Sequence, residues 1–134
     1  MTTPTSSENG KRILLVEDEP LLAQALVSSF RQDTPHTIIH VSDGEAALTE
    51  LRKSGNSIHL VLLDLKLPNV DGQTVLQEMR QMEYYDSVPV IVLTNLHLQN
   101  IEEECRNYPP IDFYVKARIE IKDVIERVEE LFTS

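Results

Sequence analysis

The sequence predicts an α/β fold, a doubly wound sandwich in which helices cover both faces of a parallel five-stranded sheet. Short continuous apolar runs alternate with amphipathic stretches five times along the chain. Strands without polar alternation are typical of parallel sheets buried on both faces. The length of 134 residues fits one compact domain. Within it we expect a disordered polar tail at residues 1–10 and a folded domain over residues 11–134.

The first repeat begins with the apolar run at residues 13–16, which predicts a buried strand. Residues 21–30 predict a helix, because Pro20 stands near its start, where a proline is tolerated. We expect its inward face to hold Leu22, Ala25, Leu26 and Ser29. The β-branched residues at 37–41 then predict the second strand.

The middle of the chain repeats the pattern. Residues 44–53 predict a helix that buries Ala47, Leu48 and Leu51, and residues 59–63 predict a central strand. The helix expected at residues 73–82 has its apolar side chains on one face. These are Val75, Leu76 and Met79.

The last part of the chain completes the five repeats. Residues 88–93 form the most strand-like run, and residues 100–107 predict a weaker helix that ends at Pro109–Pro110. Residues 111–115 predict the fifth strand. Residues 119–132 predict a strongly amphipathic final helix. Its apolar stripe consists of Ile121, Val124, Ile125, Val128, Leu131 and Phe132.

Five such repeats joined by right-handed crossovers favour the strand order 2-1-3-4-5, which is the flavodoxin-like (βα)5 arrangement. In that order the direction of winding reverses between strands 1 and 3. A ligand site is expected there, at the carboxyl ends of the strands.

Composition restricts the classes of function. The formal net charge of −10 argues against nonspecific binding to nucleic acid or to an anionic membrane. The tail lacks the apolar core of a signal peptide, and one cysteine excludes an internal disulfide, so we expect a cytoplasmic protein. The four glycines form neither GxGxxG nor a P-loop. His36 and His40 flank a strand, and we assign them no metal role.

Polar side chains follow four of the predicted strands. Glu17–Asp18 follow strand 1, Asp64 follows strand 3, Thr94 follows strand 4 and Lys116 follows strand 5. The carboxyl ends of parallel strands share one edge of the sheet, so we expect these groups to converge. Taken singly, an acid or a threonine after a strand is more often a helix cap, and a lysine there is more often a solvated charge.

Crowded carboxylates repel one another, and a divalent cation removes that penalty. Mg²⁺ prefers oxygen ligands and retains several waters. We expect Asp18 and Asp64 to bind it directly and Glu17 to act through water, and the backbone carbonyl of Lys66 could add another oxygen. The sequence therefore predicts Mg²⁺ as the cofactor.

A carboxylate can attack phosphorus and form an acyl phosphate. Catalysis of phosphoryl transfer consists mostly of positioning and of neutralising charge on the equatorial oxygens. Thr94 could donate a hydrogen bond to one phosphoryl oxygen, and the ammonium of Lys116 could pair with another. The residue set suits acceptance of a phosphoryl group by Asp64.

Four stretches resemble the receiver domains of response regulators. They are ILLVEDE at 13–19, VLLDLKLPNVDG at 61–72, PVIVLT at 89–94 and FYVK at 113–116. The resemblance covers about residues 11–133. It implies that a partner histidine kinase or phosphotransfer protein phosphorylates Asp64. It also implies that Phe113 is the aromatic switch residue acting with Thr94, although core packing alone would explain a phenylalanine there.

The chain departs from the family pattern at three places. Lys116 is followed by Ala117 and not by the usual proline, and Asn95 stands where a small residue is usual. Pro109–Pro110 replaces the common Gly-Ala before the fifth strand. These departures concern the switching movement and not the acceptor chemistry.

The main hypothesis is therefore a response-regulator receiver in a two-component phosphorelay. It is not an enzyme beyond catalysing its own phosphotransfer and dephosphorylation. The alternative is a Mg²⁺-dependent aspartate-nucleophile phosphatase of the haloacid-dehalogenase type, but Lys66 stands where that class has its general acid. A degenerate receiver that only binds protein is a third alternative, against which the intact residue set argues.

Because the chain ends directly after the fifth helix, we expect the signal to leave through another molecule. The candidate surface is formed by the helix expected at 100–107, the strand at 111–115 and the helix at 119–132. Its partner would be a second copy, giving a homodimer, or a downstream protein. We expect no binding to nucleic acid or to membrane.

Overall fold

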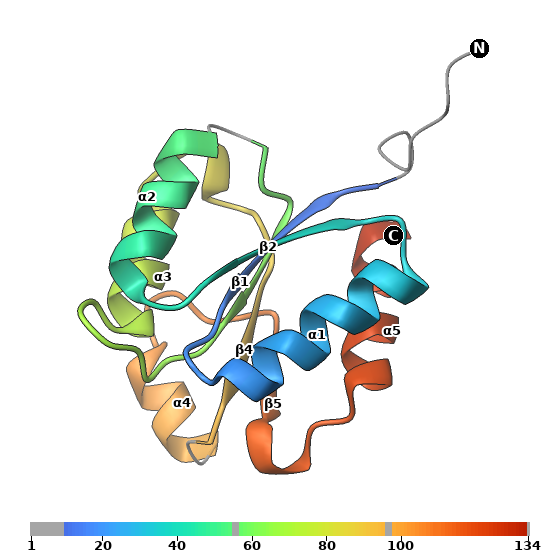
Figure 1. The fold of residues 1–134 in the computed structure, drawn as a ribbon. Helices are drawn as coiled ribbons and strands as arrows, with labels where there is room; N and C mark the ends of the chain where they lie inside the picture. The colour runs from blue at the N-terminus through green and yellow to red at the C-terminus, as the bar shows by residue number, and fades with distance from the viewer. Residues whose placement is uncertain (1–9, 55–56, 96–97, 134) are drawn as a thin grey trace.

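A computed structural model gives the structure of the protein and describes residues 10–54, 57–95 and 98–133. Within these residues, five strands and five helices alternate in sequence order (Figure 1). The elements are β1 (Arg12–Val16), α1 (Pro20–Asp33), β2 (Thr37–Val41), α2 (Gly44–Ser54), β3 (Leu60–Leu63), α3 (Gly72–Arg80), β4 (Val90–Thr94), α4 (Leu98–Glu104), β5 (Asp112–Val115) and α5 (Ile121–Thr133). Two 3₁₀ turns, η2 (Glu83–Tyr85) and η3 (Lys116–Arg118), follow α3 and β5.

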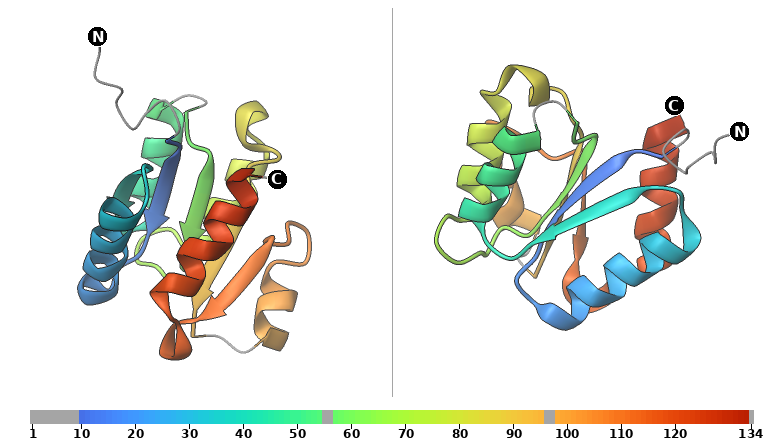
Figure 2. Two further views of the ribbon diagram at one scale, coloured as in Figure 1. Left: turned by 90° about the vertical axis from the view of Figure 1, so that its right-hand side faces the viewer. Right: turned by 45° about the horizontal axis from the view of Figure 1, so that its top comes forward.

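The strands form one parallel sheet in the order β2-β1-β3-β4-β5. This confirms the predicted doubly wound arrangement, with β1 and β3 side by side at the centre. The sheet separates two helical layers, as Figure 2 shows from two further directions. The tail expected at residues 1–10 lies, apart from Gly10, outside the described residues.

Each face of the sheet buries its own apolar cluster. Leu14 and Val16 of β1 point toward α2, α3 and α4, whereas Ile13 and Leu15 point toward α1 and α5. Successive side chains of a strand point to opposite faces, so a continuous apolar run fills both clusters. This explains why the apolar runs that predicted the strands contain no alternating polar residues.

The predicted helix faces are largely confirmed. Ala47, Leu48 and Leu51 of α2 are buried, as are Val75, Leu76 and Met79 of α3. The face expected for α1 is wrong by about one position. Its buried residues are Ala23, Leu26 and Phe30, with Leu22 only partly buried. These three residues are spaced by three and four positions, so they lie on one side of the helix. Burial of the large ring of Phe30 near the end of α1 rotates the buried face relative to the predicted one.

The ends of several elements differ from the predictions. Strand β4 begins at Val90, two residues later than expected, and ends in Thr94. Helix α4 ends at Glu104, earlier than expected, and α5 begins only after η3. Over the described residues, no helix is both long and apolar enough to cross a bilayer.

Candidate functional site

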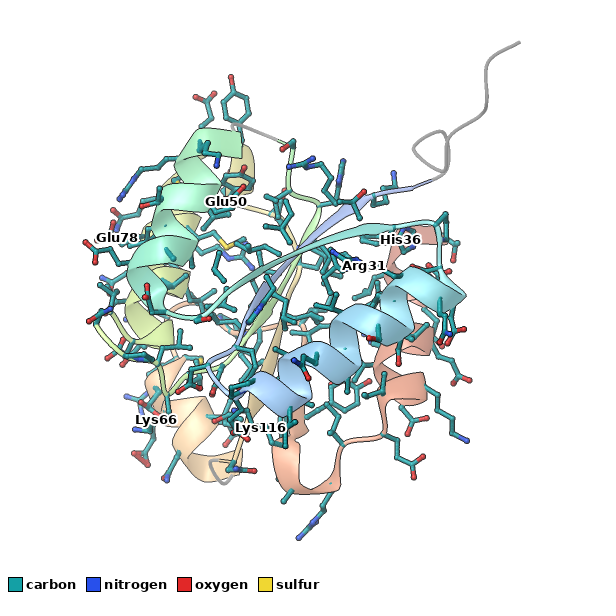
Figure 3. The ribbon with its side chains drawn as sticks, in the orientation of Figure 1. Arg31, His36, Glu50, Lys66, Glu78 and Lys116 are labelled. Carbon is teal, nitrogen blue, oxygen red and sulfur yellow. The ribbon has the colours of Figure 1, made fainter. Side chains whose placement is uncertain are left out.

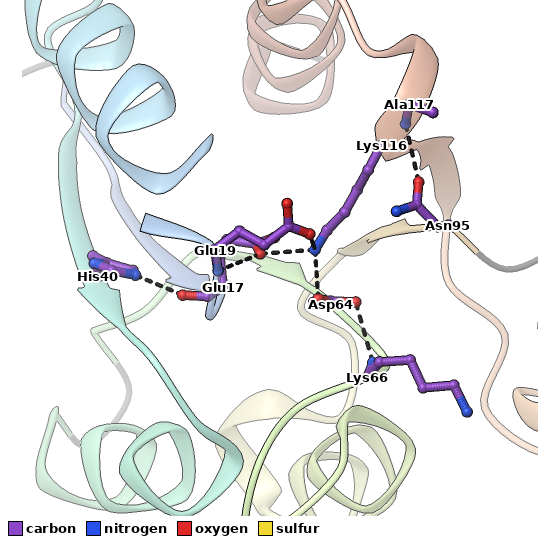
Figure 4. Close-up of polar contacts among 8 residues, drawn as sticks. All are labelled: Glu17, Glu19, His40, Asp64, Lys66, Asn95, Lys116 and Ala117. Atoms are coloured by element: carbon purple, nitrogen blue, oxygen red, sulfur yellow. Dashed lines mark hydrogen bonds and ion pairs between the residues drawn. The ribbon is translucent and has the colours of Figure 1, made fainter. Parts of the chain in front are cut away.

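The predicted polar groups meet at the carboxyl edge of the sheet. Glu17 directly follows β1, Asp64 directly follows β3, Thr94 ends β4 and Lys116 directly follows β5. Glu17, Asp64 and Thr94 are buried, with at most 2% of each residue exposed. Lys116 is partly buried, and Asp18 is exposed. Figure 4 shows Glu17, Asp64 and Lys116 pointing toward one another from three different strands.

Backbone hydrogen bonds between strands fix the main-chain positions of Glu17 and Asp64, which carry the two buried carboxylates. The amide of Asp64 donates to the carbonyl of Val16 at 3.0 Å, and the amide of Glu17 donates to that of Val41 at 3.0 Å. The ladder therefore continues one residue beyond the strands. Both side chains start from positions held by the neighbouring strand and not from mobile loops.

Two glycines let the loop after β3 pack closely against the helices beside the site. A Cβ on Gly72 would lie 2.2 Å from the carbonyl oxygen of Asp64, and one on Gly44 would lie 1.8 Å from that of Val70. Real Cβ atoms do not approach backbone so closely, so each contact requires glycine. Asn69 supplies the left-handed turn between them, with φ of 69°. The loop that carries Lys66 thus rests on the first turns of α2 and α3.

Lys116 is the centre of the charge network. Its Nζ lies 2.7 Å from Oδ2 of Asp64, 2.8 Å from Oε2 of Glu17 and 2.6 Å from Oε2 of Glu19. Its side chain is only 6% exposed, and those of Asp64 and Glu17 are 3% and 0% exposed. The other oxygen of Asp64, Oδ1, accepts the backbone N–H of Lys66 at 3.1 Å. Figure 3 places Lys116 and Lys66 at the same end of the molecule.

Burial and pairing oppose each other in this network. Burial raises the pKa of Asp64 and of Glu17, although the hydrogen bonds from Lys116 act in the other direction. Burial alone would lower the pKa of Lys116, but its hydrogen bonds to Asp64, Glu17 and Glu19 outweigh this and raise it. The ammonium is therefore charged at neutral pH and is the stabilising counter-charge for two buried carboxylates.

The donor set fits a divalent cation. Carboxylate oxygens of Glu17, Asp18 and Asp64 lie within 4.8 Å of one another. Oε1 of Glu17 is buried without a hydrogen-bond partner, which is costly for a carboxylate oxygen unless something else binds it. Oxygen ligands of this kind suit Mg²⁺ and similar hard cations. The acidic cluster therefore supports divalent metal binding.

A cavity of about 290 Å³ opens beside Asp64. Its lining combines acidic, basic and hydroxyl groups from four strand ends. These residues are Asp18, Glu19, Asp64, Lys66, Thr94, Asn95 and Lys116. The space lies next to the carboxylate that the sequence singled out, so the acid is accessible to a small anionic group even though it is buried.

Two of the departures from the family pattern touch each other. The backbone N–H of Ala117 donates to Oδ1 of Asn95 at 3.0 Å (Figure 4). A proline at position 117 has no N–H and could not make this bond. The hydrogen bond joins the end of β4 to η3, one residue beyond Thr94 and one beyond Lys116.

Phe113, the expected switch residue, lies on β5 next to Val92 of β4. Its side chain is partly buried and packs against the cluster beneath α4. It also lines a hollow of about 360 Å³ together with Ile101, Cys105 and Pro110. The ring thus stands at the boundary between the core and an open surface.

Sequence reasoning missed two residues of the network. Glu19 stands at the N-cap of α1, where its side chain makes no capping hydrogen bond and binds Lys116 instead. Nε2 of His40 lies 2.8 Å from the carbonyl oxygen of Glu17, to which it donates. An acidic N-cap at the same sheet edge as a lysine was the available signal for Glu19. Nothing in the spacing of His40 indicated its partner.

Comparisons with known proteins agree with this geometry. The sequence model of the response regulator receiver domain matches residues 13–129. Response regulator Rcp1 of Synechocystis sp. is 34% identical over 126 residues, which cover 89% of this chain and 84% of Rcp1.

Solved structures with this fold include the phosphorylated cyanobacterial phytochrome response regulator RcpA, at 26% identity and a TM-score of 0.78 over 93% of this chain and 95% of RcpA. The receiver domain of PA1611 from Pseudomonas aeruginosa, with a magnesium ion in its active-site cleft, is 28% identical with a TM-score of 0.78 over 93% of this chain and 99% of that domain. The Mn²⁺-bound form of Rcp1 is 32% identical with a TM-score of 0.72, over 90% and 91% of the two chains. The chain belongs to the response regulator receiver domain family, the signalling modules of two-component systems.

Proposed function

We propose that Asp64 is the phosphoacceptor of this receiver domain. The observation that carries the proposal is the placement of Asp64: it is buried at the carboxyl end of β3, paired with Lys116 at 2.7 Å and next to a cavity open to solvent. Membership of the family supports phosphoryl acceptance as the activity. Receiver domains act with histidine kinases or phosphotransfer proteins, so the donor we propose is a phosphohistidine on such a partner.

The transfer is a displacement at phosphorus. A carboxylate oxygen of Asp64 attacks the phosphorus of the phosphohistidine and forms a P–O bond. The P–N bond to the imidazole breaks, and its electron pair remains on that nitrogen. The ring leaves as neutral histidine because its other nitrogen carries a proton in the reacting phosphohistidine. The product is an acyl phosphate, whose later hydrolysis returns the carboxylate and inorganic phosphate.

The surrounding residues neutralise the oxygens of the transferred group. The Lys116 ammonium pairs with one phosphoryl oxygen, and the Thr94 hydroxyl donates a hydrogen bond to another. Glu17, Asp18, Asp64 and the backbone carbonyl of Lys66 would hold a divalent cation, for which we propose Mg²⁺. A bound cation supplies positive charge where the three carboxylates and the arriving phosphoryl group concentrate negative charge.

The haloacid-dehalogenase alternative is not supported. Phosphatases of that class need a general acid two residues after the nucleophile, and position 66 holds a lysine whose side chain is exposed. The family match assigns the chain to receivers, which are signalling modules and not classical enzymes. We accordingly propose that chemistry at Asp64 is limited to gaining and losing its own phosphoryl group.

We further propose that phosphorylation changes the surface formed by α4, β5 and α5. Thr94 and Phe113 lie on the neighbouring strands β4 and β5, and the ring of Phe113 borders a hollow of about 360 Å³ under α4. Movement of Thr94 toward the phosphoryl group would give the ring space to turn inward. A downstream protein or a second copy of the chain would then recognise the altered surface.

The test of the acceptor is intact-mass spectrometry after incubation with acetyl phosphate, with and without Mg²⁺. We expect one added phosphate, dependent on Mg²⁺ and absent in Asp64→Asn. Asp33→Asn is the matched control, because it removes one exposed carboxylate at the far end of α1. A phosphate that persists in Asp64→Asn would show that another residue is the acceptor.

A further inference from the structure

The peptide group between Glu17 and Asp18 has its carbonyl held by a side chain and not by the sheet. The N–H of Glu17 still belongs to the sheet, because it donates to the carbonyl oxygen of Val41 at 3.0 Å. Strand β2 ends at Val41, and the carbonyl oxygen of Glu17 accepts a hydrogen bond from Nε2 of His40 at 2.8 Å (Figure 4). The ring of His40 thus supplies the donor that a longer β2 would supply from its backbone.

This hydrogen bond bears on where Asp18 stands. A peptide group is planar, so the direction of the Glu17 carbonyl also sets where the main chain of Asp18 begins. On the other side of Asp18, the N–H of Glu19 donates to Oε2 of Glu17 at 2.9 Å. Both peptide groups that flank Asp18 are therefore restrained, the first by His40 and the second by the side chain of Glu17.

Asp18 depends on such support more than the other two acids of the cluster. The side chains of Glu17 and Asp64 are 0% and 3% exposed, and each is paired with Lys116. Asp18 is exposed, so packing does little to fix its position. Its carboxylate nevertheless belongs to the cluster whose oxygens lie within 4.8 Å of one another. The main chain on either side of Asp18 therefore decides whether its carboxylate reaches the cluster.

We propose that His40 is a positioning residue for the divalent cation, because through the carbonyl of Glu17 it holds Asp18 where its carboxylate can bind the ion. This inference rests on the proposed cation site of Glu17, Asp18 and Asp64. A ligand that is already in place loses less conformational freedom on binding, so the cation binds more tightly. Outer partners that orient metal ligands contribute to affinity in this way. His40 acts through the main chain and is not itself a ligand.

The test varies the reach of the donor at position 40, with Mg²⁺ dissociation constants measured by NMR titration of the amide signals. The amide of a glutamine reaches about as far from the main chain as Nε2 of histidine, whereas that of an asparagine is shorter by a methylene group. We expect His40→Asn to bind Mg²⁺ about two- to tenfold more weakly than the parent, as for the loss of one hydrogen bond, and His40→Gln to stay close to the parent. His59→Asn is the matched control and should not change the affinity, because this exposed ring bonds to the N–H of Arg12 at the opposite end of β1.

A second measurement separates positioning from a general effect on folding. If His40 acts through Asp18, His40→Asn should weaken Mg²⁺ binding much less when Asp18→Asn is already present, because the carboxylate that it positions is gone. An equal effect in both backgrounds, an unchanged affinity in His40→Asn, or an equal loss in His40→Gln would overturn the role of His40. The proposed cation site itself fails if Asp18→Asn binds Mg²⁺ as tightly as the parent.

Discussion

At the scale of single residues, Lys116 links function to stability. Its ammonium neutralises Asp64 and Glu17, whose side chains are 3% and 0% exposed. Removing one member of a buried ion pair leaves the other charge uncompensated, which costs more than the pair itself contributes. The residue that we propose pairs with the phosphoryl group is therefore also needed to keep two carboxylates in the interior.

We predict that Lys116→Met lowers the free energy of unfolding by about 3 kcal/mol at neutral pH in chelator, because two buried carboxylates lose their counter-charge. Added Mg²⁺ should restore part of the loss by binding the same carboxylates. Urea denaturation measures both effects. Lys53→Met, at a side chain 73% exposed, is the control and should change little. Equal stability of the two variants would contradict the role of Lys116 as counter-charge.

Tyr85 is a second residue that contributes to stability, through its buried hydroxyl group. Its ring is 2% exposed, and its hydroxyl donates to the carbonyl of Leu51 at 3.1 Å and accepts the amide of Ile58. The hydroxyl thus joins α2 to the residues before β3. We predict that Tyr85→Phe lowers stability by about 1–2 kcal/mol, because two backbone groups lose their partner. Tyr84→Phe, at an exposed neighbour, should have no such effect.

The same residue gives a pH dependence with a definite sign. Burial raises the pKa of Tyr85 above its ordinary value of 10.0. The unfolded chain therefore loses the phenolic proton at a lower pH than the folded protein does. This contribution to stability is complete below pH 10.0 and declines as the pH rises through the folded pKa. Urea denaturation at a series of alkaline pH values measures this effect. The free energy of unfolding should decline less steeply with pH in Tyr85→Phe than in Tyr84→Phe.

At the scale of elements, the sequence predicted the site residues that are positioned by the ends of strands. It did not predict contacts that depend on how far a side chain extends. Asp64 and Lys116 could be placed together because each follows an apolar run, and parallel strands end at one edge. Glu19 also stands at this edge, but its contact with Lys116 depends on how far the two side chains reach, which the residue pattern does not give. The rotated face of α1 was missed for a similar reason, since Phe30 outweighs Ala25 and Ser29 in packing.

The hydrogen bond between Asn95 and Ala117 joins two elements that both contribute to the site. It connects the end of β4, which carries Thr94, to η3, which begins with Lys116. A shift of the backbone at Thr94 that carries Asn95 with it would therefore break this bond or move η3. The two departures from the family pattern compensate each other, because the amide that proline lacks has an acceptor here.

We predict that Asn95→Ala speeds hydrogen exchange at the amide of Ala117, because the amide loses its acceptor. The bond is exposed, so the increase should be modest, about two- to tenfold, consistent with a net contribution of about 0.5–1.5 kcal/mol. NMR-detected exchange measures it residue by residue. Asn100→Ala, an exposed substitution on α4, should leave this amide unchanged. Unaltered exchange in Asn95→Ala would mean that the bond does not persist in solution.

At the scale of the whole molecule, the strand order places the proposed acceptor and the proposed output surface on different parts of one sheet. The acidic cluster comes from β1 and β3 at the centre, and the proposed output surface comes from β5 at the edge with α4 and α5. Strand β4 lies between them and contacts both through its ladders with β3 and β5. A change at Asp64 thus has a short physical route to the edge through Thr94.

This arrangement predicts where phosphorylation is detected. Amide chemical shifts should change on phosphorylation at the site and along β4, α4, β5 and α5, because Thr94 and Phe113 lie on adjacent strands. Residues of α2, which packs against β1 and α3, should change little. Thr94→Val keeps the shape of the side chain but lacks the hydroxyl, so it should still gain phosphate and lose most of the shifts beyond β4. Shifts confined to the site in the parent protein would reject the switch while leaving Asp64 as the acceptor.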